Sequence, residues 1–324
     1  MATTAESSSS KSPKRTKSFF VDVQGVLAPW NSNVSDVLFA MMYRPYPGDV
    51  FINCYPRSGG TWLSMLLYAL THGGRRPADY TALSLDVLFL ERMGRKVENT
   101  APPRRLKSHL PAKKLRLSQA AKYVYVVRDY RDCCVSLYEQ MSTRALDYRF
   151  AGVTFDDYLE RFVTGAVEDN DYFDHVNSWW EHRSSPNYFF VLLENLKNDF
   201  EHVVKDLGEF LGGPAERLVR DDRRLEELRQ LCTYDCAPKT PPKGASLSPP
   251  PPEYLRDGRC YINCLSCSNR WEAELSEEQA TKLAQYFTER TQGTPLEDLF
   301  GSLGRGKTQN DDASCLETVL RNDN

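Results

Sequence analysis

Hydrophobic positions along the chain fall into two patterns, short apolar runs and longer segments with helical spacing. Apolar, β-branched and aromatic runs at residues 49–55, 122–127 and 187–193 predict buried strands, and residues 104–108 form a short extended piece. Apolar residues recur with helical spacing at residues 61–71, 132–141, 154–164, 169–182, 199–211, 214–231 and 276–290. Strands that alternate with helices predict an α/β fold, a single domain whose central parallel β-sheet is flanked by helices on both faces.

Three polar or proline-rich segments interrupt this alternation. Residues 1–17 are rich in Ser, Thr and Lys and have no apolar core, which predicts a disordered tail rather than a secretory signal. Residues 238–259 contain three proline-rich pieces and cannot form a regular element, so we expect residues 238–270 to be a long lid loop. Residues 302–324 predict a loose C-terminal tail, which leaves residues 18–301 as the folded domain.

The overall composition excludes several classes of protein. The chain has 324 residues and a net charge of −3, so we expect no nucleic-acid partner and no binding to a membrane surface. No segment approaches the roughly 20 apolar residues of a membrane span. Nine cysteines without a signal peptide indicate free thiols in a reducing compartment, and we therefore expect a cytoplasmic protein.

Five cysteines in the C-terminal third have spacings close to those of metal sites. Cys232 and Cys236 are spaced C-x3-C, and Cys260, Cys264 and Cys267 are spaced C-x3-C-x2-C. No His lies nearby in the sequence, and the five cysteines do not form two CxxC pairs. Solvated or half-buried thiols explain them better, and no metal is predicted.

A glycine-rich turn, CYPRSGGTWL at residues 54–63, joins a predicted strand to a predicted helix. Backbone N–H groups in such a turn point at one spot, and the helix N-terminus adds positive potential. Arg57 brings a charge, while Ser58 and Thr61 bring hydroxyl groups. Gly60 stands where nucleoside-triphosphate sites have Lys, so an ATP or GTP site is not expected. The turn predicts another phosphate-like anion, and an ordinary strand-to-helix turn is the alternative.

Two further segments bring cations to strand ends. Lys107 and His109 lie two residues apart on an extended segment, so their side chains point to the same side. Arg128 ends a buried strand, and ligands of open parallel sheets bind beyond the carboxyl ends of strands. Taken alone, Lys107 and His109 fit a surface strand end, and Arg128 fits a salt bridge with Asp129 or Asp132.

Three motifs in order along the chain resemble those of the cytosolic sulfotransferases. They are YPRSGGTW at residues 55–62, LKSHLP at 106–111 and VVRDxRDxxVS at 126–136. The family has YPKSGTTW, LKTHLP and VARNxKDxxVS at the corresponding places. The similarity extends from about residue 19 to about residue 300. It implies an enzyme that transfers a sulfuryl group from 3′-phosphoadenosine 5′-phosphosulfate (PAPS) to a hydroxyl or amine of a small acceptor, leaving 3′-phosphoadenosine 5′-phosphate (PAP) and requiring no metal.

The resemblance also implies a role for individual residues. His109 matches the general base, and Lys107 and Arg57 match groups that stabilise negative charge on the transferring sulfuryl group. Residues 57–62 would hold the phosphosulfate, with Trp62 stacked on the adenine. Thr233 and Tyr234 match a pair beside the adenine, and the residues that match the 3′-phosphate site are Arg128, Ser136, Arg256 and Gly258. The residues implied to bind the donor are Arg57, Ser58, Gly59, Gly60, Thr61, Trp62, Arg128, Ser136, Thr233, Tyr234, Arg256 and Gly258.

Four positions depart from the family pattern. Arg57 replaces a Lys and differs from it in shape and donor geometry, Gly60 replaces a Thr and removes a hydroxyl, and Leu193 replaces a Tyr. An insertion of about eight residues, holding three cysteines, precedes Trp271. Because of that insertion, the 3′-phosphate could instead be held by Arg259 or Arg270.

The acceptor and the oligomeric state are less constrained by the sequence. Apolar residues near 19–26, 80–89 and 138–150 are expected to line the acceptor pocket, which favours a phenol, a catecholamine-like amine or a sterol. The family's dimer motif lacks its Lys and Thr-Val here, so we expect a monomer or a weak homodimer. The alternative functions are a catalytically impaired protein that binds PAP or PAPS, and a sulfotransferase acting on carbohydrate or protein.

Overall fold

The computed structural model describes residues 19–144, 148–233, 255–256, 259–260, 269–297 and 299–300. The two predicted tails, Tyr234, Gly258 and most of the predicted lid segment lie outside these residues. The boundaries proposed for the domain and its tails therefore stay predictions.

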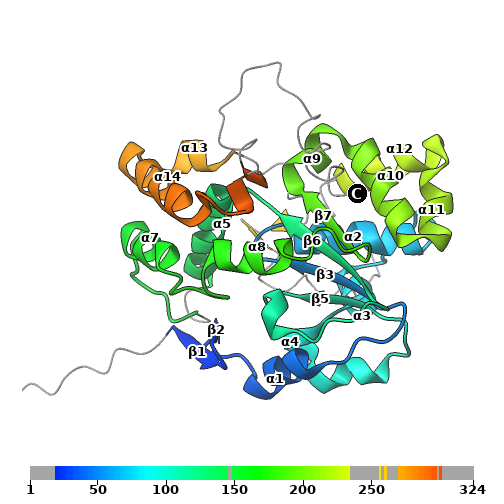
Figure 1. The fold of residues 1–324 in the computed structure, drawn as a ribbon, viewed down its shortest axis with the longest axis horizontal. Coiled ribbons are helices and arrows are strands. Elements are labelled where there is room, and N and C mark those ends of the chain that lie inside the picture. The colour runs from blue at the N-terminus through cyan, green and yellow to red at the C-terminus, as the bar shows by residue number, and fades with distance from the viewer. Residues whose placement is uncertain are drawn as a thin grey trace, which may run out of the picture.

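A five-stranded parallel sheet forms the centre of the molecule (Figure 1). Its strand order is β4-β5-β3-β6-β7. In the register of this sheet, Ile52 lies between Lys107 on one neighbouring strand and Val124 on the other. The prediction of a parallel α/β fold is confirmed. The strands are β3 (Val50–Cys54), β4 (Val87–Phe89), β5 (Arg105–Ser108), β6 (Lys122–Val127) and β7 (Tyr188–Leu192).

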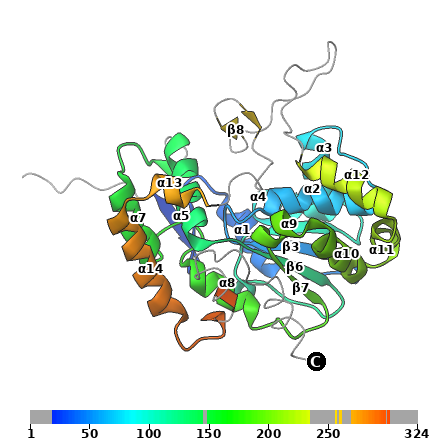
Figure 2. The same cartoon turned by 90° about the horizontal axis from the view of Figure 1, so that it is seen from above.

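Helices cover both faces of the sheet, as Figure 2 shows with α2 and α10 to α12 on one side and α5, α7 and α14 on the other. Alternate residues of β3 serve the two faces, because Phe51 belongs to one buried cluster and Ile52 to the other. Helices on the Ile52 side are α2 (Gly60–Thr71), α9 (Leu193–Asn198), α10 (Phe200–Leu211), α11 (Gly213–Val219) and α12 (Asp222–Thr233). Helices on the Phe51 side are α1 (Val34–Met42), α5 (Tyr130–Thr143), α7 (Phe155–Val163), α8 (Tyr172–Trp180) and α14 (Glu277–Thr291).

Shorter elements complete the described part of the chain. Strands of two to four residues form two antiparallel pairs, β1 with β2 and β8 with β9. The first pair brings the N-terminal segment to the cavity described below, at the carboxyl ends of the central strands. The shorter elements are β1 (Phe20–Val23), β2 (Val26–Pro29), α3 (Tyr80–Asp86), α4 (Leu90–Met93), η1 (Gly94–Asn99), η2 (Ala112–Lys114), β8 (Leu255–Arg256), β9 (Arg259–Cys260) and α13 (Trp271–Glu274).

Polar residues just before the helices fix where several of them begin. The Asp129 and Asp171 carboxylates accept backbone N–H groups in the first turns of α5 and α8. Ser276 and Gln279 form a reciprocal capping box at the start of α14. Each cap satisfies N–H groups that have no partner within the helix, and each is visible in the sequence.

Three predicted elements differ from the structure. The helix expected over residues 169–182 begins only at Tyr172, because Asp171 caps it and Asp169 and Asn170 have left-handed φ angles of 58° and 68°. The helix expected over 214–231 is two helices, since Asp221 accepts backbone N–H groups that start α12. Residues 238–259 were expected to hold no regular element, yet they include β8 and the start of β9.

Within the described ranges, no helix is both long enough and apolar enough to cross a membrane.

Candidate functional site

A cavity of about 340 Å³ opens where β3, β4 and β5 end. The glycine turn, the segment after β5 and the ends of α5 and β2 all contribute to its wall. Val26, Phe89 and Tyr148 come from the three regions that were expected to line the acceptor pocket. Phe19 does not line the cavity and packs edge-on against Phe150, with 5.6 Å between the ring centroids.

Tight packing accounts for both glycines of the turn. Gly59 has a left-handed φ of 99°, and a Cβ added to it would lie 2.9 Å from Cδ1 of Leu193. A Cβ added to Gly60 would lie 2.5 Å from Sγ of Cys54, closer than real contacts allow. The Thr that the family pattern has at position 60 would therefore collide with Cys54 in this chain, so Gly60 is required by packing.

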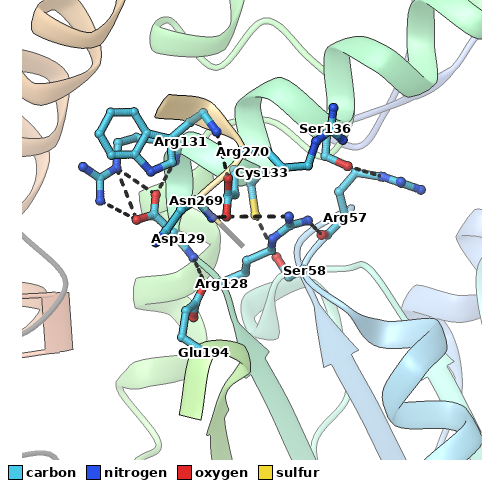
Figure 3. Close-up of polar contacts among 12 residues, drawn as sticks. Arg57, Ser58, Arg128, Asp129, Arg131, Cys133, Ser136, Glu194, Asn269 and Arg270 are labelled. Carbon is cyan, nitrogen blue, oxygen red and sulfur yellow. Dashed lines mark hydrogen bonds and ion pairs between the residues drawn. The ribbon is translucent and has the colours of Figure 1, made fainter. Parts of the chain in front are cut away.

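Two cations line the cavity at the turn: Arg57 belongs to the turn, and Lys107 lies beside it on β5. Arg57 donates from Nε to Oγ of Ser136 at 2.9 Å (Figure 3). It also donates from Nη1 to Oε1 of Gln140 at 3.1 Å. Lys107 donates from Nζ to Oγ1 of Thr61 at 3.2 Å. The N-terminus of α2 begins at the same place, so helix dipole and side-chain charge both favour an anion there.

His109 lines the cavity next to Lys107. Its Nδ1 lies 2.7 Å from the carbonyl oxygen of Cys54, which assigns the proton to Nδ1 and leaves Nε2 as an acceptor. Burial, and then the charge of Lys107, hold the pKa of His109 well below 6.5, so the imidazole is neutral at neutral pH. Its backbone N–H donates to Glu91, and its carbonyl accepts from Nε2 of His175.

Arg128 and Ser136 form hydrogen bonds with Arg57 of the turn and do not line the cavity (Figure 3). Nη1 of Arg128 donates to the carbonyl oxygen of Arg57 at 2.8 Å, and Nη2 lies 3.7 Å from the Asp132 carboxylate. The salt bridge that was the ordinary alternative for Arg128 is therefore present. The same guanidinium also supports Arg57, whose φ of 69° is unusual for a residue with a side chain.

Ser58 and Trp62 point into the protein, away from the cavity wall. Oγ of Ser58 lies 3.3 Å from Sγ of Cys133, and the Trp62 ring packs edge-on against Phe200. The structure therefore divides the six turn residues into two groups. Those that line the cavity are Arg57, Gly59, Gly60 and Thr61.

The remaining donor-binding candidates are described only in part. Thr233 ends α12, Arg256 lies in β8 and Arg259 lies in β9. The side chains of these three residues lie outside the described part of the structure. Tyr234 and Gly258 lie wholly outside it. Arg270, the other candidate clamp, pairs with both carboxylate oxygens of Glu139.

A chain of hydrogen bonds joins the turn to acidic residues that the sequence interpretation overlooked. Gln140, which accepts from Arg57, donates from Nε2 to the Tyr148 hydroxyl, and that hydroxyl donates to Oε2 of Glu168. The sequence signal is the acidic set Glu168, Asp169 and Asp171, of which the last two fall at the start of the helix predicted over residues 169–182. An apolar lining was expected, but eight of the 24 described residues that line the cavity are charged. The charged residues that line the cavity are Asp36, Arg57, Glu91, Arg92, Lys107, Arg144, Glu168 and Asp169.

Among the described residues, no group of His, Cys, Asp and Glu side chains could hold a metal ion. Cys54, Cys133 and Cys134 are buried thiols. Burial raises the pKa of Cys133 to about 12, so that thiol is protonated and unreactive.

Comparisons with known proteins agree with this architecture. A family model described as "Sulfotransferase domain" matches residues 47–295. Sulfotransferase 1A1 of Rattus norvegicus is 33% identical over 181 residues, which cover 52% of this chain and 62% of that protein. Amine sulfotransferase of Oryctolagus cuniculus is 34% identical over 169 residues, covering 50% of this chain and 56% of that protein. The chain thus spans less than two thirds of the length of either relative.

A solved structure, that of mouse sulfotransferase SULT7A1 complexed with PAP, has the same fold. Its TM-score is 0.66 at 19% sequence identity, with 88% of this chain and 99% of that chain covered. Because the family model covers more than half of the chain, the family is established: this protein is a member of the sulfotransferase family.

Proposed function

We propose that this protein transfers a sulfuryl group from PAPS to a hydroxyl or amine of a small acceptor, with His109 as the general base. The observation that carries the proposal is the pairing of His109 and Lys107 in one cavity with the glycine turn. The neutral His109 ring has Nδ1 tied to a carbonyl and Nε2 left to accept a proton. The cytoplasmic location and the monomeric or weakly dimeric state stay predictions.

The turn has the features that an anionic donor group requires. The first amides of α2, the cations Arg57 and Lys107, and the Thr61 hydroxyl gather at one end of the cavity. We assign the phosphosulfate to this end. Arg128 and Ser136 are assigned to the 3′-phosphate by family resemblance, and both form hydrogen bonds with Arg57 of the turn.

The proposed reaction needs one base and fixed positive charge. Nε2 of His109 accepts the acceptor's proton as its oxygen or nitrogen forms a bond to sulfur. The bond between sulfur and the bridging phosphate oxygen breaks, and PAP leaves with that electron pair. Lys107 and Arg57 stabilise the negative charge on the sulfuryl oxygens and on the leaving phosphate. Positioning and electrostatics supply most of the catalysis, by analogy with phosphoryl transfer.

His109→Ala tests the role of the base. We expect turnover of a phenol panel with labelled donor to fall by at least about 100-fold, the size of a lost general base. The Kd for PAP, measured by calorimetry, should stay within about twofold because the nucleotide contacts are elsewhere. Turnover close to that of the unmodified protein would refute the assignment, and intact PAP binding without transfer by the unmodified protein would refute the enzymatic function.

His109→Asn is the matched variant. An Asn amide nitrogen can take the place of Nδ1 and donate to the Cys54 carbonyl, so the local structure is kept while the base is lost. Loss of turnover in both variants, with unfolding transitions like that of the unmodified protein, separates a chemical role from a structural one.

A further inference from the structure

Asp169 is a buried acid that faces the cavity without a donor. Its exposed fraction is 9%, and its side chain lines the cavity that also contains His109. Across the ranges that the structure describes, no N–H or O–H group donates to its carboxylate and no cation forms an ion pair with it. A buried carboxylate without partners is costly, so a position of this kind indicates a group that arrives from outside.

The backbone around Asp169 holds its carboxylate in the cavity. The Asp169 N–H donates to the carbonyl of Leu27 at 2.9 Å, and the Leu27 N–H donates to Oδ1 of Asn170 at 2.9 Å. The buried Tyr55 hydroxyl contacts the carbonyls of Glu168 and Asn170 from the other side. Asp169 and Asn170 are both left-handed, a conformation that Asp and Asn tolerate better than most residues. The loop is therefore fixed from two sides.

In the part of the chain that the structure describes, positive charges surround Glu168 but not its neighbour Asp169. Glu168 accepts from Tyr148 and lies in the field of Arg57, Arg92 and Arg144. No described cation offsets the cost of ionising Asp169 in this way. Burial raises the pKa of Asp169 well above its ordinary value, and the nearby carboxylates of Glu168 and Glu91 raise it further. A cation beside Asp169 would remove that penalty, whereas a neutral group would leave it.

The part of the cavity wall formed by Phe89 and His109 suits an aromatic ring. Phe89 packs edge-on against the His109 ring at 5.0 Å between centroids, so an apolar surface adjoins the proposed base. The cavity of about 340 Å³ lies at the small end of the range for ligand sites and also includes the turn assigned to the phosphosulfate. The space beside His109 therefore fits a single-ring acceptor better than a fused-ring one.

From this arrangement we infer that Asp169 binds the ammonium group of the acceptor, and that the acceptor is a single-ring phenol carrying a short amine chain. The inference rests on the proposed function. Asp169 is a specificity-determining residue in it, because it contacts the acceptor at a distance from the atoms that react.

Matched acceptors test the inference without altering the protein. The probes are 4-(2-aminoethyl)phenol, its N-acetyl derivative and 4-ethylphenol, which share the phenol and differ in charge. We expect kcat/KM for the cationic phenol to exceed that for each neutral phenol by about tenfold or more, the value of one charge-assisted contact. Equal values for the three phenols would overturn the inference and leave the proposed sulfotransferase activity standing.

Asp169→Asn removes the charge, keeps the shape and retains a residue suited to a left-handed φ. We expect it to reduce kcat/KM for the cationic phenol about tenfold or more and to change that for 4-ethylphenol less than about twofold. Asp171→Asn is the matched control: it removes a nearby negative charge that caps α8 outside the cavity, and Asn also caps helices. An equal loss for both phenols, or an equal loss in both variants, would overturn the inference.

Calorimetry with PAP-loaded protein decides the matter even if no acceptor is turned over. The cationic phenol should bind about tenfold more tightly than 4-ethylphenol, and Asp169→Asn should abolish the difference. Failure of sulfate transfer with this binding preference intact would refute the proposed activity and support the cation site. Equal binding of the two phenols would refute the cation site alone.

Discussion

Replacing Gly60 by Ala tests whether packing rather than catalysis selects glycine at this position. The added Cβ would lie 2.5 Å from Sγ of Cys54 and 3.1 Å from Cε of Lys107. Cys54 is fully buried in the central strand β3, so the sulfur has to move by roughly 1 Å to restore an ordinary contact. Such overpacking costs about 1–3 kcal/mol. The gain in helix propensity at the start of α2 offsets at most about 1 kcal/mol.

We therefore expect Gly60→Ala to lower the free energy of unfolding by about 1–2 kcal/mol, measured by urea denaturation. The melting temperature should fall by roughly 2–4 °C for each kcal/mol. Adding Cys54→Ala removes the sulfur that collides with the new methyl group. The double variant should then be less destabilised than the sum of the single variants, with a coupling of about 1–3 kcal/mol.

Cys134→Ala provides the matched control for this cycle. Cys134 is a second buried thiol, and it does not meet the Cβ that would be added at Gly60. Its change should combine additively with Gly60→Ala, within about 0.5 kcal/mol. Additivity in the Cys54 cycle as well would show that the packing argument is wrong.

Two further predictions concern the donor and the base. Arg128→Ala should weaken PAP binding by about tenfold to 100-fold, because it removes a charge-assisted partner. Replacing the exposed Arg220, the residue after α11, by Gln should leave the Kd unchanged. A Kd within twofold for Arg128→Ala would contradict the assignment. Because the pKa of His109 is lowered, the imidazole stays neutral at pH 6.5 and above. In a scan of roughly pH 5–8, kcat/KM for a neutral phenol should therefore fall only below pH 6.5. Lys107→Met should move this loss of activity to higher pH, because the Lys107 charge is the second cause of the lowered His109 pKa. A loss of activity at or above pH 6.5 in the unmodified protein would contradict the argument.

The core of the sheet was predictable from the sequence, because the strands buried on both faces are nearly continuous apolar runs. The predicted strands at 122–127 and 187–193 match β6 and β7 to within a residue. Elements whose formation depends on distant partners were missed. β4 has only three residues, and β1 and β2 are short strands that pair with each other at the edge of the site.

The same distinction applies to the site. The proximity of Arg57 and Lys107 could be predicted, because Arg57 follows β3 and Lys107 lies near the end of β5, and the ends of neighbouring parallel strands meet. Asp169 could not, since its position depends on contacts with Leu27 and Tyr55, far away in the sequence. The meaning of Gly60 was hidden as well: comparison of motifs indicates a lost hydroxyl, and only the neighbouring Cys54 explains why no side chain fits.

The position of β3 in the sheet has a consequence for how the chain folds during synthesis. β3 is the central strand, yet its partners β5 and β6 begin at Arg105 and Lys122, long after β3 itself has been made. One edge of this apolar strand therefore stays unpaired until the chain has been extended past residue 108, and the other edge until it has been extended past residue 127. Parallel sheets with such non-local pairing fold slowly and expose strand edges that can aggregate. Recombinant production should accordingly gain from slower synthesis at lower temperature.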